Sequence, residues 1–349
     1  MKYKILPGTD IDVSLICLGT MNWGQQNSEA QAHEQLEYAV AHDVNFIDTA
    51  EIYPVPPDPE KQGRTESYLG SWLYKSGKRN DLILASKVSP SSIIRTRSYT
   101  GDLPRLDRDN IFAAIDGSLS RLNTDYLDLY QVHWPERKTN FFGVRGVESL
   151  GDDSQAPSIE ETLSALAEVV KSGKARYIGV SNETPWGIME YLRLSKEKGL
   201  PRILTTQNQY SLTNRTFEIG LSELCLHEHV GLLAYSPLSM GVLTGKYLDG
   251  ATPAGARFTV QQRNSPRYNP PHAQEAVARY VDLARKNGFD PATLALSFVN
   301  GRSFVTSNII GATSVEQLKV DIASVDVELS SDIMAEIAKI YTVYPDPTA

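Results

Sequence analysis

Short runs of apolar and β-branched residues alternate along the chain with longer segments whose apolar positions recur at helical spacing. Eight of the short runs are typical of strands, at residues 16–20, 45–50, 82–88, 126–134, 176–182, 203–210, 232–238 and 307–313. Among the helical segments, one face is marked by Ile159, Leu163, Leu166, Ala167 and Val170. This alternation predicts a parallel sheet whose strands are joined by right-handed helical crossovers.

Several helix starts are marked by capping residues. Three pairs fit the capping box, in which two side chains three residues apart each bond the other's backbone: Ser28 with Gln31, Ser158 with Glu161, and Ser314 with Gln317. Two further starts place proline after an N-cap residue: Thr184 with Pro185, and Asp290 with Pro291. We expect helices to begin at these five places.

Eight strand–helix units that close on themselves predict an α/β fold, a (β/α)₈ TIM barrel forming one domain over residues 1–349. A doubly wound sheet is the alternative, but LGTMNWG at residues 18–24 lacks the G-x-G-x-x-G pattern expected after its first strand. Residues 2–14 are expected to form a hairpin that plugs the barrel. Residues 329–340 predict an extra C-terminal helix, followed by a loose tail. Long loops, which usually carry function, are expected at 54–63, 135–157 and 239–271.

Composition narrows the possible partners. The 349 residues carry a net charge of −8, and because nucleic acids and anionic membranes favour basic surfaces, neither is expected as a partner. No apolar run approaches the roughly 18 residues that cross a bilayer, and the N-terminus lacks the apolar core of a signal peptide. Cys17 and Cys225 lie in apolar stretches and are expected as buried thiols, which favours a cytoplasmic location. His227 and His229 are interpreted as a solvated helix end, so no metal is expected.

Four ionisable residues stand at or just beyond the carboxyl ends of neighbouring strands. Asp48 ends the second strand and Tyr53 follows it, while Lys87 and His133 end the third and fourth. In a barrel of this kind, these strand ends and the loops after them build the active site. Taken singly, each residue has an ordinary structural interpretation, such as a cap or a core histidine. Together, at corresponding strand ends, they favour a catalytic set.

A physical account joins the four residues. A phenol is a poor acid near neutral pH, and a neighbouring ammonium group should lower the pKa of Tyr53 by favouring the phenolate. Lys87, if buried, needs a counter-charge, which Asp48 can supply. His133 can donate a hydrogen bond to a substrate oxygen. We therefore expect Tyr53 to act as a general acid for an oxygen that gains negative charge.

The motifs around these residues resemble those of the aldo-keto reductase family. The four residues lie in DTAEIY (48–53), SK (86–87) and QVHWP (131–135). The likeness continues in order through IGVSN (178–182), TQNQYS (206–211), AYSPLSMGVLTGKY (234–247) and IIGATSVEQL (309–318). Two stretches, YPVPPDPEKQG and QVHWPER, look close to a bacterial subgroup, the Tas-type reductases. Potassium-channel β subunits are similar at a greater distance.

The resemblance implies that Asp48, Tyr53, Lys87 and His133 are catalytic, and that a small-molecule aldehyde or ketone is reduced with NADPH bound in the barrel mouth. Carboxamide contacts are implied for Ser181, Asn182 and Gln207, and ring stacking for Tyr235. The remaining implied cofactor contacts are Gly19, Thr20, Met21, Asp48, Ser236, Pro237, Leu238, Ser239, Gly241, Leu243, Gly245, Lys246, Arg257, Gly311, Thr313, Gln317 and Asp321.

Two features depart from the family pattern. Asp321 stands where the family usually has asparagine, which adds negative charge near the site expected for a phosphate. The loop after Tyr53 is long and proline-rich, which should reshape the pocket mouth and leave the four catalytic residues in place. The substrate pocket is expected to be formed by Tyr53 and His133. Trp23, Trp134 and Phe141 are candidate walls, with ordinary core packing as the alternative for each.

Two other functions stay open. A nucleotide-binding regulatory subunit, like the channel β subunits, would keep the same four residues, and a large exposed apolar patch would favour it. A barrel enzyme that uses Lys87 as a Schiff-base nucleophile would leave Tyr235 and the loop after it unexplained. A monomer is expected, with an oligomer left open.

Overall fold

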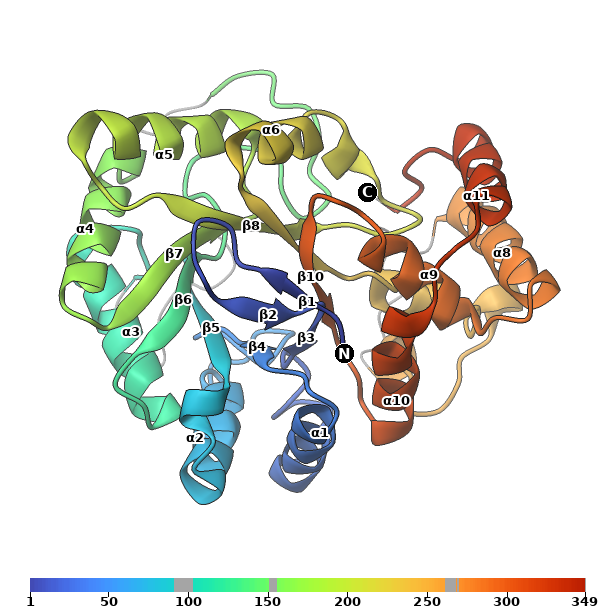
Figure 1. Ribbon diagram of the computed structural model, residues 1–349, viewed down its shortest axis with the longest axis horizontal. Helices are drawn as coiled ribbons and strands as arrows, with labels where there is room; N and C mark the ends of the chain where they lie inside the picture. Colours follow the sequence, from blue (N-terminus) through green and yellow to red (C-terminus); the bar gives the residue numbers. More distant parts are fainter. Residues whose placement is uncertain (91–102, 151–155, 261–267, 269, 349) are drawn as a thin grey trace.

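Eight parallel strands close into a barrel in the computed structural model, which describes residues 1–90, 103–150, 156–260, 268 and 270–348. Around the barrel the order is β10, β3, β4, β5, β6, β7, β8 and β9, so the first and last barrel strands pair (Figure 1). The strands are β3 (Ile16–Gly19), β4 (Phe46–Asp48), β5 (Ile83–Val88), β6 (Leu127–Val132), β7 (Ala175–Ser181), β8 (Ile203–Gln209), β9 (Gly231–Tyr235) and β10 (Val305–Ile310). The predicted (β/α)₈ barrel is confirmed.

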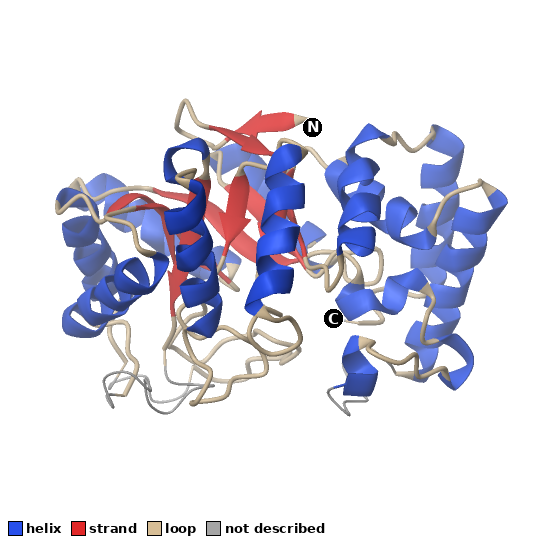
Figure 2. Ribbon diagram, turned by 90° about the horizontal axis from the view of Figure 1, so that it is seen from below, coloured by secondary structure: helices blue, strands red, loops and turns tan. Residues whose placement is uncertain are grey.

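Helices surround the barrel, and a further group lies beside it (Figures 1 and 2). Those following the strands are α1 (Glu29–Ala41), α2 (Arg64–Ser76), α3 (Arg108–Leu122), α4 (Ile159–Lys171), α5 (Pro185–Lys198), α6 (Leu221–Glu228) and α10 (Val315–Ala323). The others are α7 (Arg257–Val260), α8 (Pro271–Lys286), α9 (Pro291–Asn300) and α11 (Ser331–Val343). The predicted C-terminal helix is α11, which packs against α8. Short 3₁₀ helices span Arg79–Asp81, Thr216–Glu218, Ser239–Thr244, Leu248–Gly250 and Ser324–Asp326.

The N-terminal hairpin closes one end of the barrel, as predicted. Its strands, β1 (Tyr3–Ile5) and β2 (Asp12–Ser14), pair antiparallel, and Figure 2 shows them at the end opposite the long loops. Three hairpin side chains, from Leu6, Ile11 and Val13, pack on a cluster inside the barrel made of Cys17, Phe46, Ala85, Leu129, Leu204, Leu233 and Ile309. Apolar side chains therefore fill the end under the hairpin.

Alternate residues of each strand point into the barrel, so the interior face continues from the apolar end to the opposite end. Successive strand side chains point to opposite faces, so every second residue shares a side. Asp48 follows Phe46 on the inner face, and Lys87 follows Ala85. Both charged residues are buried. The sequence thus places charged groups inside the barrel near the carboxyl ends of β4 and β5.

The helix starts follow the predicted caps, but two of the three predicted capping boxes lack their second bond. Ser28 and Gln31 form the complete capping box. Ser158 and Ser314 each accept a bond from the backbone three residues on. The side chain of Gln317, however, accepts from Thr313 instead of completing the box at Ser314. On α4 the buried face includes Val169, one residue before the predicted Val170.

The tail after α11 is packed, so the prediction of a loose tail is wrong. Thr348 is fully buried, and its backbone N–H donates to the Thr213 carbonyl at 3.0 Å. Its hydroxyl lies 2.9 Å from Thr213 Oγ1, and Asp346 accepts a bond from the Arg215 backbone. These contacts join segments far apart in sequence, so no local sequence pattern predicts them.

Other sequence expectations concern membranes, metals and thiols. No helix in the described ranges has the length and apolar character needed to cross a bilayer. Among the described residues, no group of three or more His, Cys, Asp or Glu side chains could hold a metal ion. Cys17 and Cys225 are buried free thiols. Parts of two predicted loops, at 151–155 and at 261–267 with 269, lie outside the described residues.

Candidate active site

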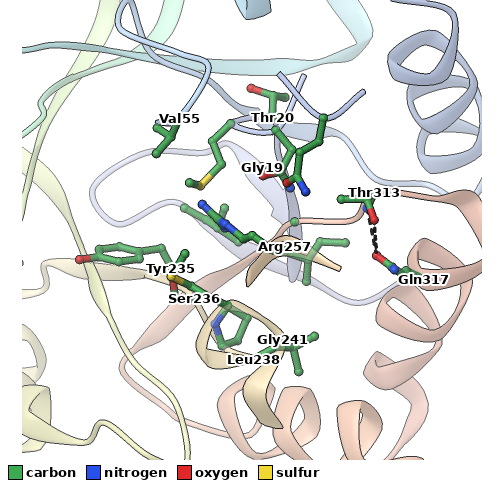
Figure 3. Close-up of a pocket in the computed structure, with 18 of the residues that line it drawn as sticks. Gly19, Thr20, Val55, Tyr235, Ser236, Leu238, Gly241, Arg257, Thr313 and Gln317 are labelled. Carbon is green, nitrogen blue, oxygen red and sulfur yellow. Dashed lines mark hydrogen bonds between the residues drawn. The ribbon is translucent and has the colours of Figure 1, made fainter. Parts of the chain in front are cut away.

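A cavity of about 1210 Å³ opens at the carboxyl ends of the barrel strands. Its wall is drawn from the segments that follow most of the strands, including Asp48 and Tyr53 after β4, His133 after β6 and Asn182 after β7. Figure 3 shows residues after β3, β9 and β10 around the same space. Ligand pockets are usually about 300–1,000 Å³, so this cavity has room for a large ligand together with a small one.

Lys87 is not among the lining residues and lies behind Asp48 and Tyr53, which are; it is fully buried, at 0% exposure. Its ammonium donates to Asp48 Oδ2 at 2.6 Å, to the Thr49 carbonyl at 2.7 Å and to Tyr53 Oη at 3.4 Å. Because an ammonium group has three N–H donors, all of them have acceptors. The predicted chain from Asp48 through Lys87 to Tyr53 is present as contacts between neighbouring groups.

Neighbouring charges explain why Lys87 stays protonated although it is buried. Burial lowers the pKa of Lys87, but Asp48 and Tyr53 favour the cation more strongly, so the pKa is raised overall. For Tyr53, burial raises the pKa and exceeds the opposing effect of Lys87. The expectation of a net lowering at Tyr53 is therefore wrong for this arrangement. As a result, Tyr53 keeps its proton through the neutral range.

His133 directly follows the carboxyl end of β6 and lies beside the phenol of Tyr53. Its ring centroid lies 5.7 Å from that of Tyr53, with the rings at 76°. Nδ1 is 2.9 Å from Ser89 Oγ. Burial, reinforced by the charge of Lys87, holds the pKa of His133 well below its ordinary value. The imidazole is therefore neutral at physiological pH and carries one N–H.

Two glutamines hold the second oxygen of Asp48. Gln207 Nε2 donates to Asp48 Oδ1 at 2.8 Å, and Gln131 Nε2 lies 3.3 Å from the same atom. Sequence reasoning missed Gln131 as part of the site, although its place between Leu129 and His133 on alternate positions put it on the inner face. Both carboxylate oxygens of Asp48 are thus fixed by donors from three different strands.

A second set of bonds joins β7, β8 and β9. Asn182 Nδ2 donates to the His133 carbonyl at 2.9 Å, and Tyr235 Oη donates to Asn182 Oδ1 at 2.7 Å. Ser181 Oγ donates to the Gln207 carbonyl at 2.8 Å. Asn182 has φ of 55°, in the left-handed region that asparagine tolerates better than most residues. The side chains predicted to hold a carboxamide are therefore tied to one another and to the backbone of His133.

Most of the residues expected to contact a cofactor line the cavity. Those that do are Gly19, Thr20, Met21, Asp48, Ser181, Asn182, Gln207, Tyr235, Ser236, Pro237, Leu238, Gly241, Lys246, Arg257, Gly311, Thr313, Gln317 and Asp321. Ser239, Leu243 and Gly245 are not among the lining residues. Ser239 is fully buried and bonds the hydroxyls of Ser211 and Thr213, while Leu243 packs in the core. These three lie behind the wall and support it.

The aromatic walls differ from the prediction. Trp134 lines the cavity, but Trp23 is fully buried in the main core, with its indole N–H donating to Gln35 at 3.1 Å. Trp23 is therefore a packing residue, because the turn after β3 directs its ring toward α1. Phe142 lines the cavity in place of Phe141, and the two rings meet edge to face at 5.1 Å.

Two basic side chains and one carboxyl group also line the cavity. Lys246 and Arg257 line it, and the charge of Arg257 reaches both Lys246 and Tyr53. Arg257 lines the cavity, as expected for a cofactor contact (Figure 3). Asp321 faces Lys246 from α10, and burial followed by the charge of Asp290 raises the pKa of Asp321 to about 7. The predicted conflict of a carboxylate with a bound phosphate is thus reduced when Asp321 holds a proton.

The residues present fit a long anionic cofactor. Two basic side chains line the cavity, and α10 directs its N-terminus toward it at Thr313 (Figure 3), where anions are favoured. A Cβ at Gly19 would lie 2.7 Å from the Ile310 carbonyl, so glycine is needed where β3 meets β10. Gly241, with φ of 88°, gives the wall after β9 a turn that other residues rarely adopt.

This barrel with its Asp–Lys–Tyr contact chain agrees with what family comparison finds. Residues 15–342 match the aldo/keto reductase family, and the chain belongs to it. Protein tas of Escherichia coli K12 is 55% identical over 347 residues, covering 99% of each chain. An uncharacterized oxidoreductase of Bacillus subtilis 168, YrpG, is 30% identical over 98% of this chain and 96% of its own.

A more distant relative bears out the rest of the predicted resemblance. A probable voltage-gated potassium channel subunit beta of Arabidopsis thaliana is 28% identical over 94% of this chain and 92% of its own. The resemblance stated from the motifs, to the family, to the Tas type and to the channel subunits, is confirmed.

Proposed function

We propose that this protein reduces an aldehyde or ketone to an alcohol with NADPH, using Tyr53 as the general acid. The observation that carries the proposal is the buried Lys87, which bonds both Asp48 and Tyr53 at the edge of a large cavity. A buried ion pair is costly to maintain for stability alone. Its placement against a protonated phenol supports a role in proton transfer.

Each residue then has a distinct task. A carbonyl oxygen placed near Tyr53 Oη and the ring of His133 receives a hydrogen bond from each. When the carbonyl carbon is reduced, negative charge develops on that oxygen, and the Tyr53 proton moves to it. Lys87 stabilises the phenolate that remains, and Asp48 keeps Lys87 charged and in place. Bound NADPH would supply the hydride.

The cavity supports the cofactor assignment. Tyr235 presents a ring beside Asn182, and Lys246 with Arg257 supplies positive charge along the wall. We propose that these groups hold the nicotinamide and phosphate parts of NADPH, and that the preference over NADH comes from the basic pair. A charge-assisted hydrogen bond is worth about 1.5–3 kcal/mol, so losing one phosphate contact should weaken binding roughly tenfold or more.

Absorbance loss from NADPH with a panel of small aldehydes and ketones tests the proposal. We expect turnover of some of them to the alcohol, and turnover lowered roughly 10²- to 10⁴-fold in Tyr53→Phe. The matched control is Tyr74→Phe, which removes an exposed hydroxyl on α2 far from the cavity. Tight NADPH binding with no turnover of any carbonyl would contradict the proposal and favour the alternative of a nucleotide-binding regulatory subunit. A cytoplasmic, monomeric protein remains part of the proposal.

A further inference from the structure

Ser89 is placed to control His133, and no motif of the sequence pointed to it. It follows β5 directly, two residues after Lys87, and is fully buried. Its backbone N–H donates to Glu51 Oε1 at 2.8 Å, and Glu51 is also fully buried. The hydroxyl lies 2.9 Å from His133 Nδ1. A buried carboxylate therefore fixes the serine, and the serine meets the imidazole.

The backbone of His133 is held separately from its ring. Its N–H donates to the Val88 carbonyl at 2.8 Å, and its carbonyl accepts from Asn182 at 2.9 Å. These bonds fix the main chain but leave the ring torsion open, and such terminal torsions have broad preferences. The contact with Ser89 is the one that settles which ring nitrogen faces the cavity.

The direction of that bond determines the chemistry. A neutral imidazole has one N–H, on Nδ1 or on Nε2. If Nδ1 carried it, the Ser89 hydroxyl would accept, and its own proton would need another acceptor. Within the described parts of the chain, Ser89 Oγ has no other hydrogen-bond partner. A buried hydroxyl without an acceptor is costly, so the arrangement favours Ser89 as donor and Nδ1 as acceptor.

We propose that Ser89 is a positioning residue that fixes His133 as the Nε2–H tautomer, so that the ring offers a hydrogen-bond donor to the cavity. The inference rests on the proposed function for its catalytic meaning, because a donor at Nε2 is what a carbonyl oxygen requires. The opposite tautomer would present a lone pair, which repels a carbonyl oxygen. Ser89 touches neither substrate nor cofactor and acts through the imidazole.

The tautomer can be measured directly in protein labelled with ¹⁵N-histidine, in the presence of NADPH. His133→Gln identifies the His133 signals by their loss. In the wild type, Nδ1 should have the shift of an unprotonated nitrogen and Nε2 that of a protonated one. In Ser89→Ala, the two shifts should move toward each other as both tautomers become populated. Ser89→Thr, which keeps the hydroxyl, should restore the wild-type pattern.

Kinetics provide the second readout. A single hydrogen bond sets the tautomer, so kcat for carbonyl reduction should fall roughly two- to tenfold in Ser89→Ala, while Kd for NADPH changes less than twofold. Ser86→Ala is the matched control, because Ser86 is an equally buried strand hydroxyl that bonds Glu66 at 2.6 Å. It should leave the His133 signals unchanged. Should Ser89→Ala misfold, Ser89→Cys fills the site with a weaker donor and should move the two shifts in the same direction but less far.

Two results would overturn the inference: a protonated Nδ1 in the wild type, or His133 signals unaffected by Ser89→Ala. The failure of the proposed function is distinguishable from either. A wild-type protein that reduces no carbonyl defeats the proposed function, yet its nitrogen shifts still decide the role of Ser89.

Discussion

Replacing Lys87 by methionine should destabilise the protein as well as stop catalysis. The change removes three donated hydrogen bonds and leaves Asp48, which is 2% exposed, without its cation. Gln131 and Gln207 still donate to Asp48 Oδ1, so the carboxylate keeps part of its solvation. Removing one partner of a buried ion pair costs about 3–5 kcal/mol, and the glutamines should keep this variant at the lower end.

The melting temperature gives the assay. An unfolding entropy of about 2.1 cal/mol/K per residue implies roughly 1.4 °C per kcal/mol for a chain of this length, so a loss near the lower end, about 3 kcal/mol, should reduce Tm by about 4 °C. Adding Asp48→Asn to Lys87→Met removes the stranded charge and should recover part of the loss. The control is Lys339→Met, which breaks an exposed pair with Glu336 on α11 and should change Tm little.

The reasoning would be refuted by a Lys87→Met variant that melts within 1 °C of the wild type. It would equally fail if the double variant were less stable than the single one, because the loss would then come from packing and not from the unpaired carboxylate.

Three further predictions concern acid catalysis, pH dependence and packing. Tyr53→Phe should lower single-turnover reduction by roughly 10² to 10⁴ with NADPH affinity almost unchanged; near-normal hydride transfer would point to His133 as the acid. The pKa of Asp321, raised to about 7, means that the folded protein binds this proton more tightly than the unfolded chain. The stability it confers is full below the unfolded value near 4 and is lost as pH rises through 7; Asp321→Asn should flatten Tm between pH 5 and 8, and an equally steep profile would contradict this. Trp23→Ala should cost about 3–5 kcal/mol of stability, measured by urea unfolding, with little change in KM. Trp134 is equally buried but also lines the cavity, so Trp134→Ala should lose a similar amount of stability and change KM for carbonyl substrates as well; similar KM shifts in both variants would place Trp23 in the pocket.

The candidate catalytic set could be predicted from the sequence because it depends on local patterns. Asp48 and Lys87 end strands whose alternation is legible in the letters themselves, and parallel strands align their carboxyl ends. Capping and proline signals likewise located the starts of several helices. These features depend on residues close together in the chain, which is why they could be predicted before any three-dimensional information.

What the sequence did not reveal depends on contacts between distant segments. Whether Trp23 faces the cavity or α1 is decided by the turn after β3, and the packed tail at Thr348 depends on Thr213. The net pKa of Tyr53 needed the depth of burial as well as the presence of Lys87. Ser89 gave no signal because a serine two residues after a lysine is unremarkable until the fold sets it against His133.

The residues around the cavity come from two sets of neighbouring strands, a first arc (β4 to β6) and a second arc (β7 to β10). The strands β4 to β6 and the segments directly after them carry Asp48, Tyr53, Lys87 and His133, while β7 to β10 supply much of the remaining cavity wall. Substitutions in the second arc, apart from Gln207, can therefore change what the cavity binds while leaving Asp48 and Lys87 in place. Gln207 connects the two arcs, because its side chain on β8 donates a hydrogen bond to Asp48 on β4. Recombination between two relatives would be tolerated best where Asp48 and Gln207 are inherited from the same parent.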